Sequence, residues 1–225
     1  MQALEAGAAL CVASDAALKG HENVLIVEDT LVALQDLARE YRETFKFPVL
    51  AITGSNGKTT SKELLATVLN TKYKVHYTAG NLNNHLGVPL TLLATPPDAD
   101  FAVIEMGANH QGEISSLCSI AMPKFGAITN IGAAHLEGFG GMEGVKKGKS
   151  ELFKYLMAND GLFFLNIEEK SLDFLKAHDD RIMNIGFDSE EIARSERESE
   201  FLSFEFQGNS VETHLVGQYN LSNVL

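Results

Sequence analysis

The chain has 225 residues, of which 45% are hydrophobic, as expected for a globular protein with one large domain and part of another. Its 18 basic and 30 acidic residues give a formal charge of −12, which would repel nucleic acid, so we expect no nucleic-acid partner. The two cysteines are too few for a disulfide framework, and the sequence shows neither a signal peptide nor an apolar run near the roughly 18 residues of a membrane span. We therefore expect a cytoplasmic protein without a membrane partner.

The first 46 residues predict two short strands and one helix. The strands are expected at residues 8–13 and 24–27, and the helix at 30–41, where apolar side chains fall on one face. These elements are too few to form a domain by themselves. We expect residues 1–46 to be the C-terminal remnant of an N-terminal α/β domain.

From residue 47 onward, short apolar runs alternate with helical patterns. The alternation predicts βαβ crossovers and an α/β fold with a doubly wound, mostly parallel sheet, in which ligands bind beyond the carboxyl ends of the strands. The predicted strands are 49–53, 74–77, 101–106, 125–130, 162–166 and 181–185, and the predicted helices are 59–70, 88–94, 113–121 and 142–158. We assign residues 47–225 to one domain.

The last part of this domain begins with a charged stretch, residues 188–200, which we expect to be a solvated loop or an exposed helix. The apolar runs 201–206 and 211–216 follow it. They flank the turn sequence Gln207-Gly208-Asn209-Ser210, so they predict a β-hairpin.

The loop after the strand at 49–53 carries the strongest functional signal. It consists of Thr53, Gly54, Ser55, Asn56, Gly57, Lys58, Thr59 and Thr60. A strand, a glycine-containing loop and a helix N-terminus form a cradle for phosphate, in which the lysine supplies positive charge and the hydroxyl of Thr59 is placed to bind magnesium. A usual P-loop has glycine where this chain has Ile52. The pattern predicts that a nucleoside triphosphate binds, without choosing the reaction.

Polar residues at two further strand ends are candidates for a metal site. Glu105 ends an apolar strand, where its carboxylate can reach a metal ion shared with Thr59 and the phosphates; the alternative is a surface acid. His135 follows the strand that ends at Asn130 and is surrounded by glycines. On spacing alone, His135 is either a metal ligand or a structural or exposed histidine.

Two more segments have both a functional and a simpler interpretation. The segment Lys146-Lys147-Gly148-Lys149 is a basic patch early on a helix. The amides of Asn81, Asn83 and Asn84 lie in a polar loop that opens the helix at 88–94, where they can bind a polar substrate or cap the helix.

Together these motifs resemble the Mur ligase family of cell-wall synthesis, which shares its central-domain plan with folylpolyglutamate synthetase. Residues 53–60 match the family's loop, Thr-Gly-x-x-Gly-Lys-Thr/Ser-Thr. This loop does not require glycine at the position of Ile52, which explains why the glycine of a usual P-loop is absent there. Residues 79–91, which contain the asparagine-rich loop 80–85, and residues 105–114 resemble the corresponding segments of those members that add D-alanyl-D-alanine.

This resemblance implies roles for individual residues. Glu105, His135 and Thr59 would bind Mg²⁺, Lys58 would contact the transferred phosphate, and Lys149 matches a lysine that several members carbamylate, which would make it a further metal ligand. Residues 217–225 resemble a segment whose asparagines lie near the nucleotide. Those asparagines are Asn220 and Asn223, while Tyr219 replaces the usual histidine.

The resemblance implies an ADP-forming amide ligase that uses ATP and Mg²⁺. It would phosphorylate UDP-N-acetylmuramoyl-tripeptide to an acyl phosphate, which D-alanyl-D-alanine then attacks, and we expect it to act as a monomer. The resemblance also implies that residues 1–46 belong to the N-terminal domain that binds the UDP substrate. Family members continue into a C-terminal ligase domain, so we expect this chain to be a fragment that is inactive alone.

Three alternatives remain open. The first is another Mur or folylpolyglutamate synthetase-type ligase. The second is a P-loop phosphotransferase or switch GTPase, which has no need of the asparagine-rich loop or Lys149. The third is a nucleotide-binding module without turnover of its own.

Overall fold

A computed structural model describes residues 2–176, 179–186, 192–194, 201–206, 208–217 and 220–224. Its centre is a six-stranded sheet with the order β4-β5-β3-β6-β7-β8. The strands are β3 (Val49–Thr53), β4 (Val75–Tyr77), β5 (Phe101–Glu105), β6 (Phe125–Ile128), β7 (Leu162–Asn166) and β8 (Ile182–Ile185). Every pairing in this sheet is parallel, which confirms the predicted doubly wound α/β fold.

Helices cover both faces of the sheet, so its central strand is apolar on both sides. Along β3, Val49 and Ala51 belong to one core cluster, whereas Leu50 and Ile52 belong to a second, because successive side chains of a strand point to opposite faces. The second cluster lies under α3 (Lys58–Leu69). The first lies under α4 (Gly87–Leu93), α5 (Glu113–Ala121) and α8 (Glu151–Ala158).

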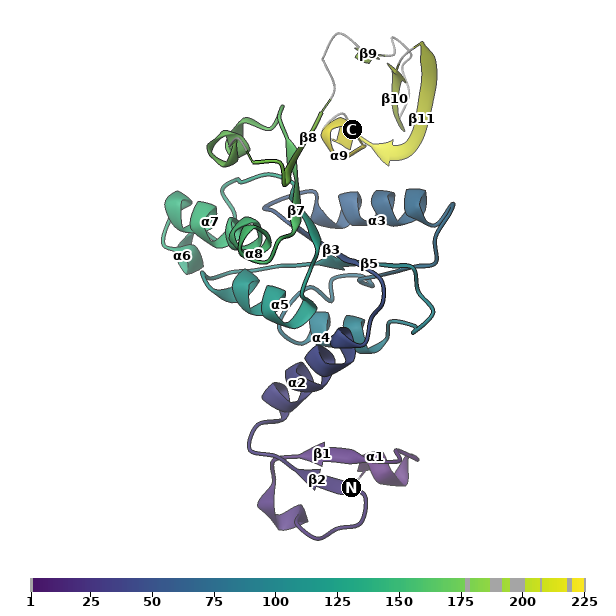
Figure 1. Ribbon diagram of the computed structural model, residues 1–225, viewed down its shortest axis with the longest axis vertical. Helices are drawn as coiled ribbons and strands as arrows, with labels where there is room; N and C mark the ends of the chain where they lie inside the picture. Colours follow the sequence, from purple (N-terminus) through teal and green to yellow (C-terminus); the bar gives the residue numbers. More distant parts are fainter. Residues whose placement is uncertain are drawn as a thin grey trace.

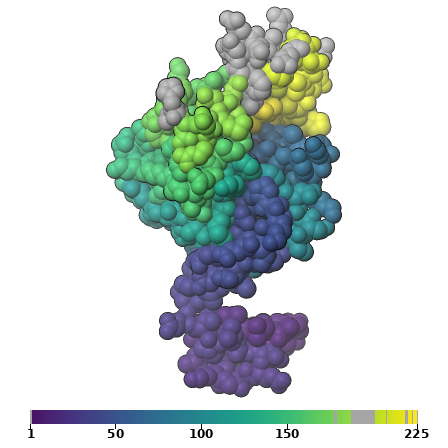
Figure 2. All heavy atoms as spheres, in the orientation of Figure 1, coloured from purple at the N-terminus to yellow at the C-terminus, as the bar shows by residue number. Residues whose placement is uncertain are grey.

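The N-terminal residues form two parts with different packing. The first part contains α1 (Gln2–Glu5), β1 (Cys11–Ala13), the 3₁₀ turn η1 (Ala16–Leu18) and β2 (Val24–Ile26). β1 and β2 pair in parallel, and none of residues 2–29 is buried. Figure 2 shows this part as a lobe at the end opposite the C-terminal hairpin.

The second part, α2 (Thr30–Glu43), lies on the central domain (Figure 1). The carboxylate of Asp29 accepts hydrogen bonds from the N–H groups of Leu31 and Val32, which starts the helix. Ala38 is fully buried in the core cluster under α4 and α5. The domain boundary after residue 46 stays a prediction, but α2 shares the core of the domain that follows it.

One prediction near the middle of the chain is corrected. The helix expected over 142–158 is two helices, α7 (Met142–Lys149) and α8, which meet at Ser150. The Ser150 hydroxyl donates to the carbonyl of Lys146, and a serine that bonds to the preceding turn often bends a helix. The short α6 (Leu136–Phe139) and the 3₁₀ turn η2 (Lys170–Leu175) were not predicted.

The C-terminal part forms a small antiparallel sheet of order β11-β10-β9. Its hairpin, β10 (Phe201–Phe206) and β11 (Asn209–Val216), is confirmed, although β11 begins two residues earlier than predicted. The loop or exposed helix expected over 188–200 is contradicted at residues 192–194, which form the strand β9 (Ile192–Arg194). Pairing with β10 outweighs the local conformational preference of this charged segment. The other residues of that stretch lie outside the described ones. α9 (Leu221–Val224) ends the described chain.

Among the described residues, no helix combines the length and apolar character that crossing a membrane requires.

Candidate active site

The loop between β3 and α3 is built to hold an anion. Gly54 and Gly57 have φ values of +144° and +78°, which residues other than glycine rarely adopt. Gly57 stands at the N-terminus of α3, and no side chain caps this helix among the described residues. The N–H groups of the first turn, which includes Thr60, therefore lack helical partners and are available to phosphate.

Residues that follow β6 hold this loop in place. The side-chain amide of Asn130 bonds to both backbone groups of Asn56, accepting from its N–H at 3.1 Å and donating to its carbonyl at 3.1 Å. The N–H of Ser55 donates to the carbonyl of Asn130, and the N–H of Gly132 donates to the Ser55 hydroxyl. These bonds fix the loop in advance of any ligand.

The side chain of Lys58 folds back onto the phosphate loop. Its ammonium group donates to the carbonyls of Gly54 at 2.8 Å and Ser55 at 3.0 Å. Burial lowers the pKa of Lys58, and the nearby charge of Glu105 opposes this change. The predicted phosphate-binding lysine thus lies within the cradle.

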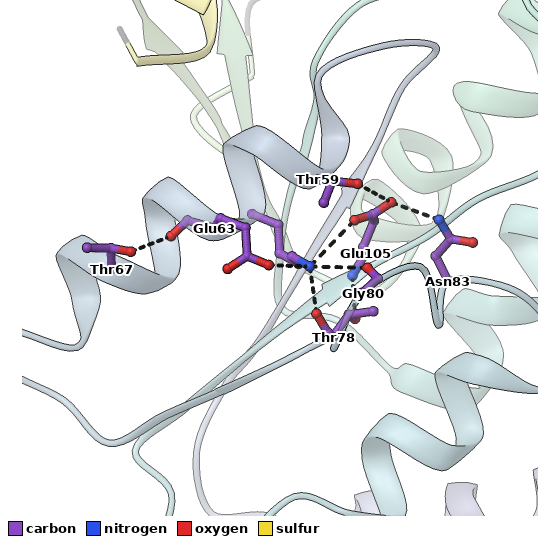
Figure 3. A network of polar contacts seen from close by, with 8 residues as sticks. Thr59, Glu63, Thr67, Thr78, Gly80, Asn83 and Glu105 are labelled. Carbon is purple, nitrogen blue, oxygen red and sulfur yellow. Dashed lines mark hydrogen bonds and ion pairs between the residues drawn. The ribbon is translucent and has the colours of Figure 1, made fainter. Parts of the chain in front are cut away.

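Glu105 occupies the end of β5 and is 1% exposed, so it is not an ordinary surface acid. Its Oε1 accepts hydrogen bonds from the Thr59 hydroxyl at 3.2 Å and from Asn83 Nδ2 at 2.7 Å (Figure 3). Its backbone N–H donates to the Thr78 hydroxyl at 2.9 Å. The structure therefore brings together Thr59 and Glu105, the pair predicted to share a metal ion.

This pair fits a magnesium ion. Thr59 Oγ1 and Glu105 Oε1 are 3.2 Å apart, close to the roughly 2.9 Å between neighbouring ligands of an octahedral ion with bonds near 2.1 Å. Glu105 Oε2 is buried without a hydrogen bond from the described residues, so the carboxylate keeps unused acceptor capacity. No group of three His, Cys, Asp or Glu side chains in the described part could hold a metal, so phosphate and water would complete the coordination.

A cavity of about 330 Å³ opens beside the loop. Its wall contains Gly54, Ser55, Lys58, Asn83, Asn84, His85, Gly107, Ala108, Asn109, Glu113, Ser116, Leu117, His135 and Lys149. His135 is in this wall with a left-handed backbone, φ +53°, at the start of α6. Asn83 and Asn84 also line it, and Asn84 Oδ1 caps α4 by accepting from the N–H groups of Leu86 and Gly87. Asn81 is exposed and is not part of the wall.

Lys149 is the last residue of α7 and is only 2% exposed, unlike a lysine of a solvated basic patch. Its ammonium group donates to the Ala108 carbonyl at 3.3 Å and lies 5.4 Å from the centre of the Phe139 ring. Burial, with a further contribution from the positive charge of Lys58, lowers the pKa of Lys149 to about 8. A minor fraction of this amine, about a tenth at pH 7, is therefore neutral.

The C-terminal helix α9 closes the back of the loop. An added Cβ on Gly57 would collide with the side chain of Asn223, whose amide donates to Asn220 Oδ1 at 2.9 Å. Asn220 in turn donates to the Val216 carbonyl at 3.0 Å. Asn223 thus lies against the loop, with Asn220 behind it. Tyr219 lies outside the described residues, and contact of the two asparagines with a nucleotide stays a prediction.

One buried lysine of this region was not singled out from the sequence. Lys62 of α3 is fully buried, and its Nζ lies 3.9 Å from Glu105 Oε2. A lysine one turn after Lys58 is usually exposed, so the sequence carries no signal of its burial.

Residues 52–225 match the family model of the Mur ligase middle domain. The chain belongs to the Mur ligase family. The UDP-N-acetylmuramoyl-tripeptide--D-alanyl-D-alanine ligase of Bacillus subtilis (strain 168) is 43% identical over 169 residues, 74% of this chain and 37% of that ligase. The Escherichia coli (strain K12) ligase of the same name is 49% identical over 144 residues, 64% of this chain and 32% of that ligase.

Solved structures give the same family. A structure of MurF from Acinetobacter baumannii has a TM-score of 0.81 at 31% identity, over 99% of this chain and 50% of that one. MurF from Thermotoga maritima in complex with ADP has a TM-score of 0.79 at 30% identity, over 99% of this chain and 53% of that one. This Mur ligase chain therefore spans only about a third to a half of the relatives' length.

Proposed function

We propose that this chain carries the ATP-binding part of a ligase that adds D-alanyl-D-alanine to UDP-N-acetylmuramoyl-tripeptide during peptidoglycan synthesis. The observation that carries the proposal is the cavity in which Lys58 of the phosphate loop and the buried Lys149 share one wall. A P-loop phosphotransferase has no need of the second lysine. The names of the relatives support the choice of substrates.

The reaction needs ATP because a carboxylate is a poor electrophile. A carboxylate oxygen of the tripeptide would attack the γ-phosphorus of ATP, the bond to the bridging oxygen would break, and ADP would leave. The amine of D-alanyl-D-alanine would then attack the acyl carbon and release phosphate. Two anions must meet in the first step, and Lys58 with the N–H groups of the loop would neutralise their charge.

The proposed magnesium ligands are Thr59, Glu105 and His135, the last because it lines the cavity that also contains Lys58 and Asn83, the hydrogen-bond partner of Glu105. When bound, Mg²⁺ supplies positive charge to the phosphates. We extend the proposal to the carbamylation of Lys149: its neutral amine would bond to the carbon of CO₂ and lose a proton, which gives an anionic carbamate that can bind metal. The change would also replace the repulsion between Lys149 and Lys58 by attraction.

The remaining roles are assigned by position. Asn220 and Asn223 would support the nucleotide from behind the loop, and Asn83 and Asn84 would contact the substrate from the cavity wall. The role predicted for Asn81 has no such support. We further propose that the enzyme is monomeric and cytoplasmic.

The test is phosphate release from ATP in the presence of UDP-N-acetylmuramoyl-tripeptide and D-alanyl-D-alanine. It is measured with the 225-residue chain and with the longest natural chain that contains it, leaving out one substrate at a time. We expect release by the longer chain to require both acceptor substrates. Release that is independent of both would favour a nucleotidase, and GTP preferred over ATP would favour a switch GTPase.

Replacing Lys58 by Ala should lower the turnover number of the longer chain by about 100-fold or more, because its charge acts mainly on the transferred phosphoryl group. Binding of the tripeptide substrate, measured by calorimetry, should change much less. Lys147→Ala, which removes an exposed lysine, serves as the control. An unchanged turnover number in Lys58→Ala would contradict the assignment.

A further inference from the structure

Lys62 is a buried cation placed between the phosphate-loop helix and the asparagine-rich loop. Its side chain is 0% exposed, and its Nζ donates to the carbonyls of Thr78 at 2.6 Å and Gly80 at 3.4 Å. It also forms an ion pair with Glu63 at 2.9 Å. An apolar side chain would occupy this space without the desolvation cost of a buried charge, so the charge calls for an explanation.

The two carboxylate oxygens of Glu105 have different surroundings. Oε1 receives the hydrogen bonds from Thr59 and Asn83 (Figure 3). Oε2 receives no hydrogen bond from the described residues and lies 3.9 Å from Lys62 Nζ, within ion-pair distance. The charge of Lys62 therefore compensates the oxygen that receives no hydrogen bond from the described part of the chain.

We propose that Lys62 is a positioning residue of the metal site, which makes Glu105 a ligand through Oε1 alone and so favours Mg²⁺ over larger cations. The proposal rests on the proposed function, which places the metal between Thr59 and Glu105. A cation at Oε2 opposes the approach of a second cation to that oxygen. The carboxylate would then bind a metal ion through Oε1, the oxygen that contacts the Thr59 hydroxyl.

Binding through one oxygen distinguishes the two common divalent ions. Mg²⁺ requires six ligands near 2.1 Å and commonly takes one oxygen from each carboxylate, whereas Ca²⁺ accepts six to eight ligands and often takes both. Losing the charge of Lys62 frees Oε2 and should help Ca²⁺ more than Mg²⁺. A purely structural role, in which Lys62 only holds the loop carbonyls, would alter binding with both ions alike.

The experiment measures ADP binding by calorimetry in saturating Mg²⁺ and in saturating Ca²⁺ for the 225-residue chain and three variants. Lys62→Met removes the charge and the hydrogen bonds. Lys62→Gln removes the charge but keeps a donor for the Thr78 carbonyl, so it covers the case in which Lys62→Met does not fold. Glu63→Gln removes the negative charge of the half-exposed ion-pair partner of Lys62 and is the matched control.

We expect the preference for Mg²⁺, expressed as the ratio of the two dissociation constants, to fall roughly tenfold in both Lys62 variants, because a charge that close to the carboxylate acts strongly on it. It should stay unchanged in Glu63→Gln. An unaltered ratio in folded Lys62 variants, or loss of the fold in both, would overturn the assignment and leave the proposed function standing. Absence of metal-dependent ADP binding by the unchanged chain would overturn the metal site itself, and the role of Lys62 with it.

Discussion

Three buried ionisable side chains near the phosphate loop differ in how their charge is compensated. Lys62 and Glu105 face each other, and Lys62 also contacts two carbonyls and Glu63. Lys149 has one carbonyl partner and an aromatic ring; Lys58 repels its charge, and Glu113 and Glu151 attract it without a direct ion pair among the described residues. Of the two buried lysines, Lys149 is therefore the one better suited to react as a neutral amine.

This environment gives Lys149 a defined pH dependence. Because its pKa is lowered to about 8, about a tenth of the amine is neutral at pH 7 and about half at pH 8. At a fixed concentration of dissolved ¹³CO₂, carbamate formed on Lys149 should rise through pH 8, as measured by ¹³C NMR. Lys149→Ala should lose the signal, and Lys147→Ala, which removes an exposed neighbour, should keep it. A signal that persists in Lys149→Ala would assign the carbamate to another amine.

The same lowered pKa affects stability. Between about pH 8 and 10.5 the unfolded chain binds more protons at this lysine than the folded chain does. The contribution of Lys149 to the free energy of unfolding therefore rises with pH across this window, as the cost of its buried charge disappears.

The sequence predicted the positions of those residues whose place in the fold follows from a local pattern. Glu105 follows an apolar run that had to be a buried strand, and Gly54 and Gly57 follow from the phosphate-loop pattern. Lys62 could not be predicted, because its burial depends on the loop after β4, which folds over α3 from 16 residues away. The capping role of Asn84 was one of two interpretations that the sequence left open, and the structure shows it.

At the scale of elements, the phosphate loop depends on the close approach of α9. Gly57→Ala should lower the free energy of unfolding by about 1–2 kcal/mol through its left-handed backbone alone, and the collision with Asn223 adds to that. It should also weaken ADP binding. Gly112→Ala is the matched control: it has a similar φ of +87° at the N-terminus of α5, but its added Cβ meets nothing within 4 Å. Denaturant unfolding and calorimetry measure the two effects. An equal loss of ADP affinity in both variants would contradict the role of the contact with Asn223.

Elements were predicted well where burial on both faces imposes a continuous apolar run, as in β3 and β5. Elements were predicted poorly where a tertiary contact determines the conformation of the segment. The apolar periodicity over 142–158 continues through Ser150, so the break between α7 and α8 leaves no trace in it. β9 owes its conformation to pairing with β10 rather than to its own charged sequence.

At the scale of the whole molecule, the central domain includes a helix from the predicted N-terminal remnant. Tyr41 of α2 donates to the Thr95 carbonyl at 2.8 Å. Arg42 donates to the carbonyls of Ala121 at 2.7 Å and Met122 at 2.9 Å, which satisfies the C-terminal end of α5. The residues before α2, 2–29, bury no side chain.

Two truncations should therefore behave differently. A chain of residues 29–225, which keeps the Asp29 cap of α2, should unfold within about 2 °C of the 225-residue chain. A chain of residues 47–225 should unfold about 4–10 °C lower, because it loses the burial of Ala38 and four hydrogen bonds from α2 to neighbouring carbonyls. Thermal unfolding followed by circular dichroism gives both values. Arg42→Ala in the 225-residue chain should reproduce part of the loss, and Arg39→Ala, whose side chain pairs only with exposed Asp36 among the described residues, should not. Equal midpoints for the two truncated chains would instead support a domain boundary after residue 46, with α2 contributing nothing to the stability of the domain on which it lies.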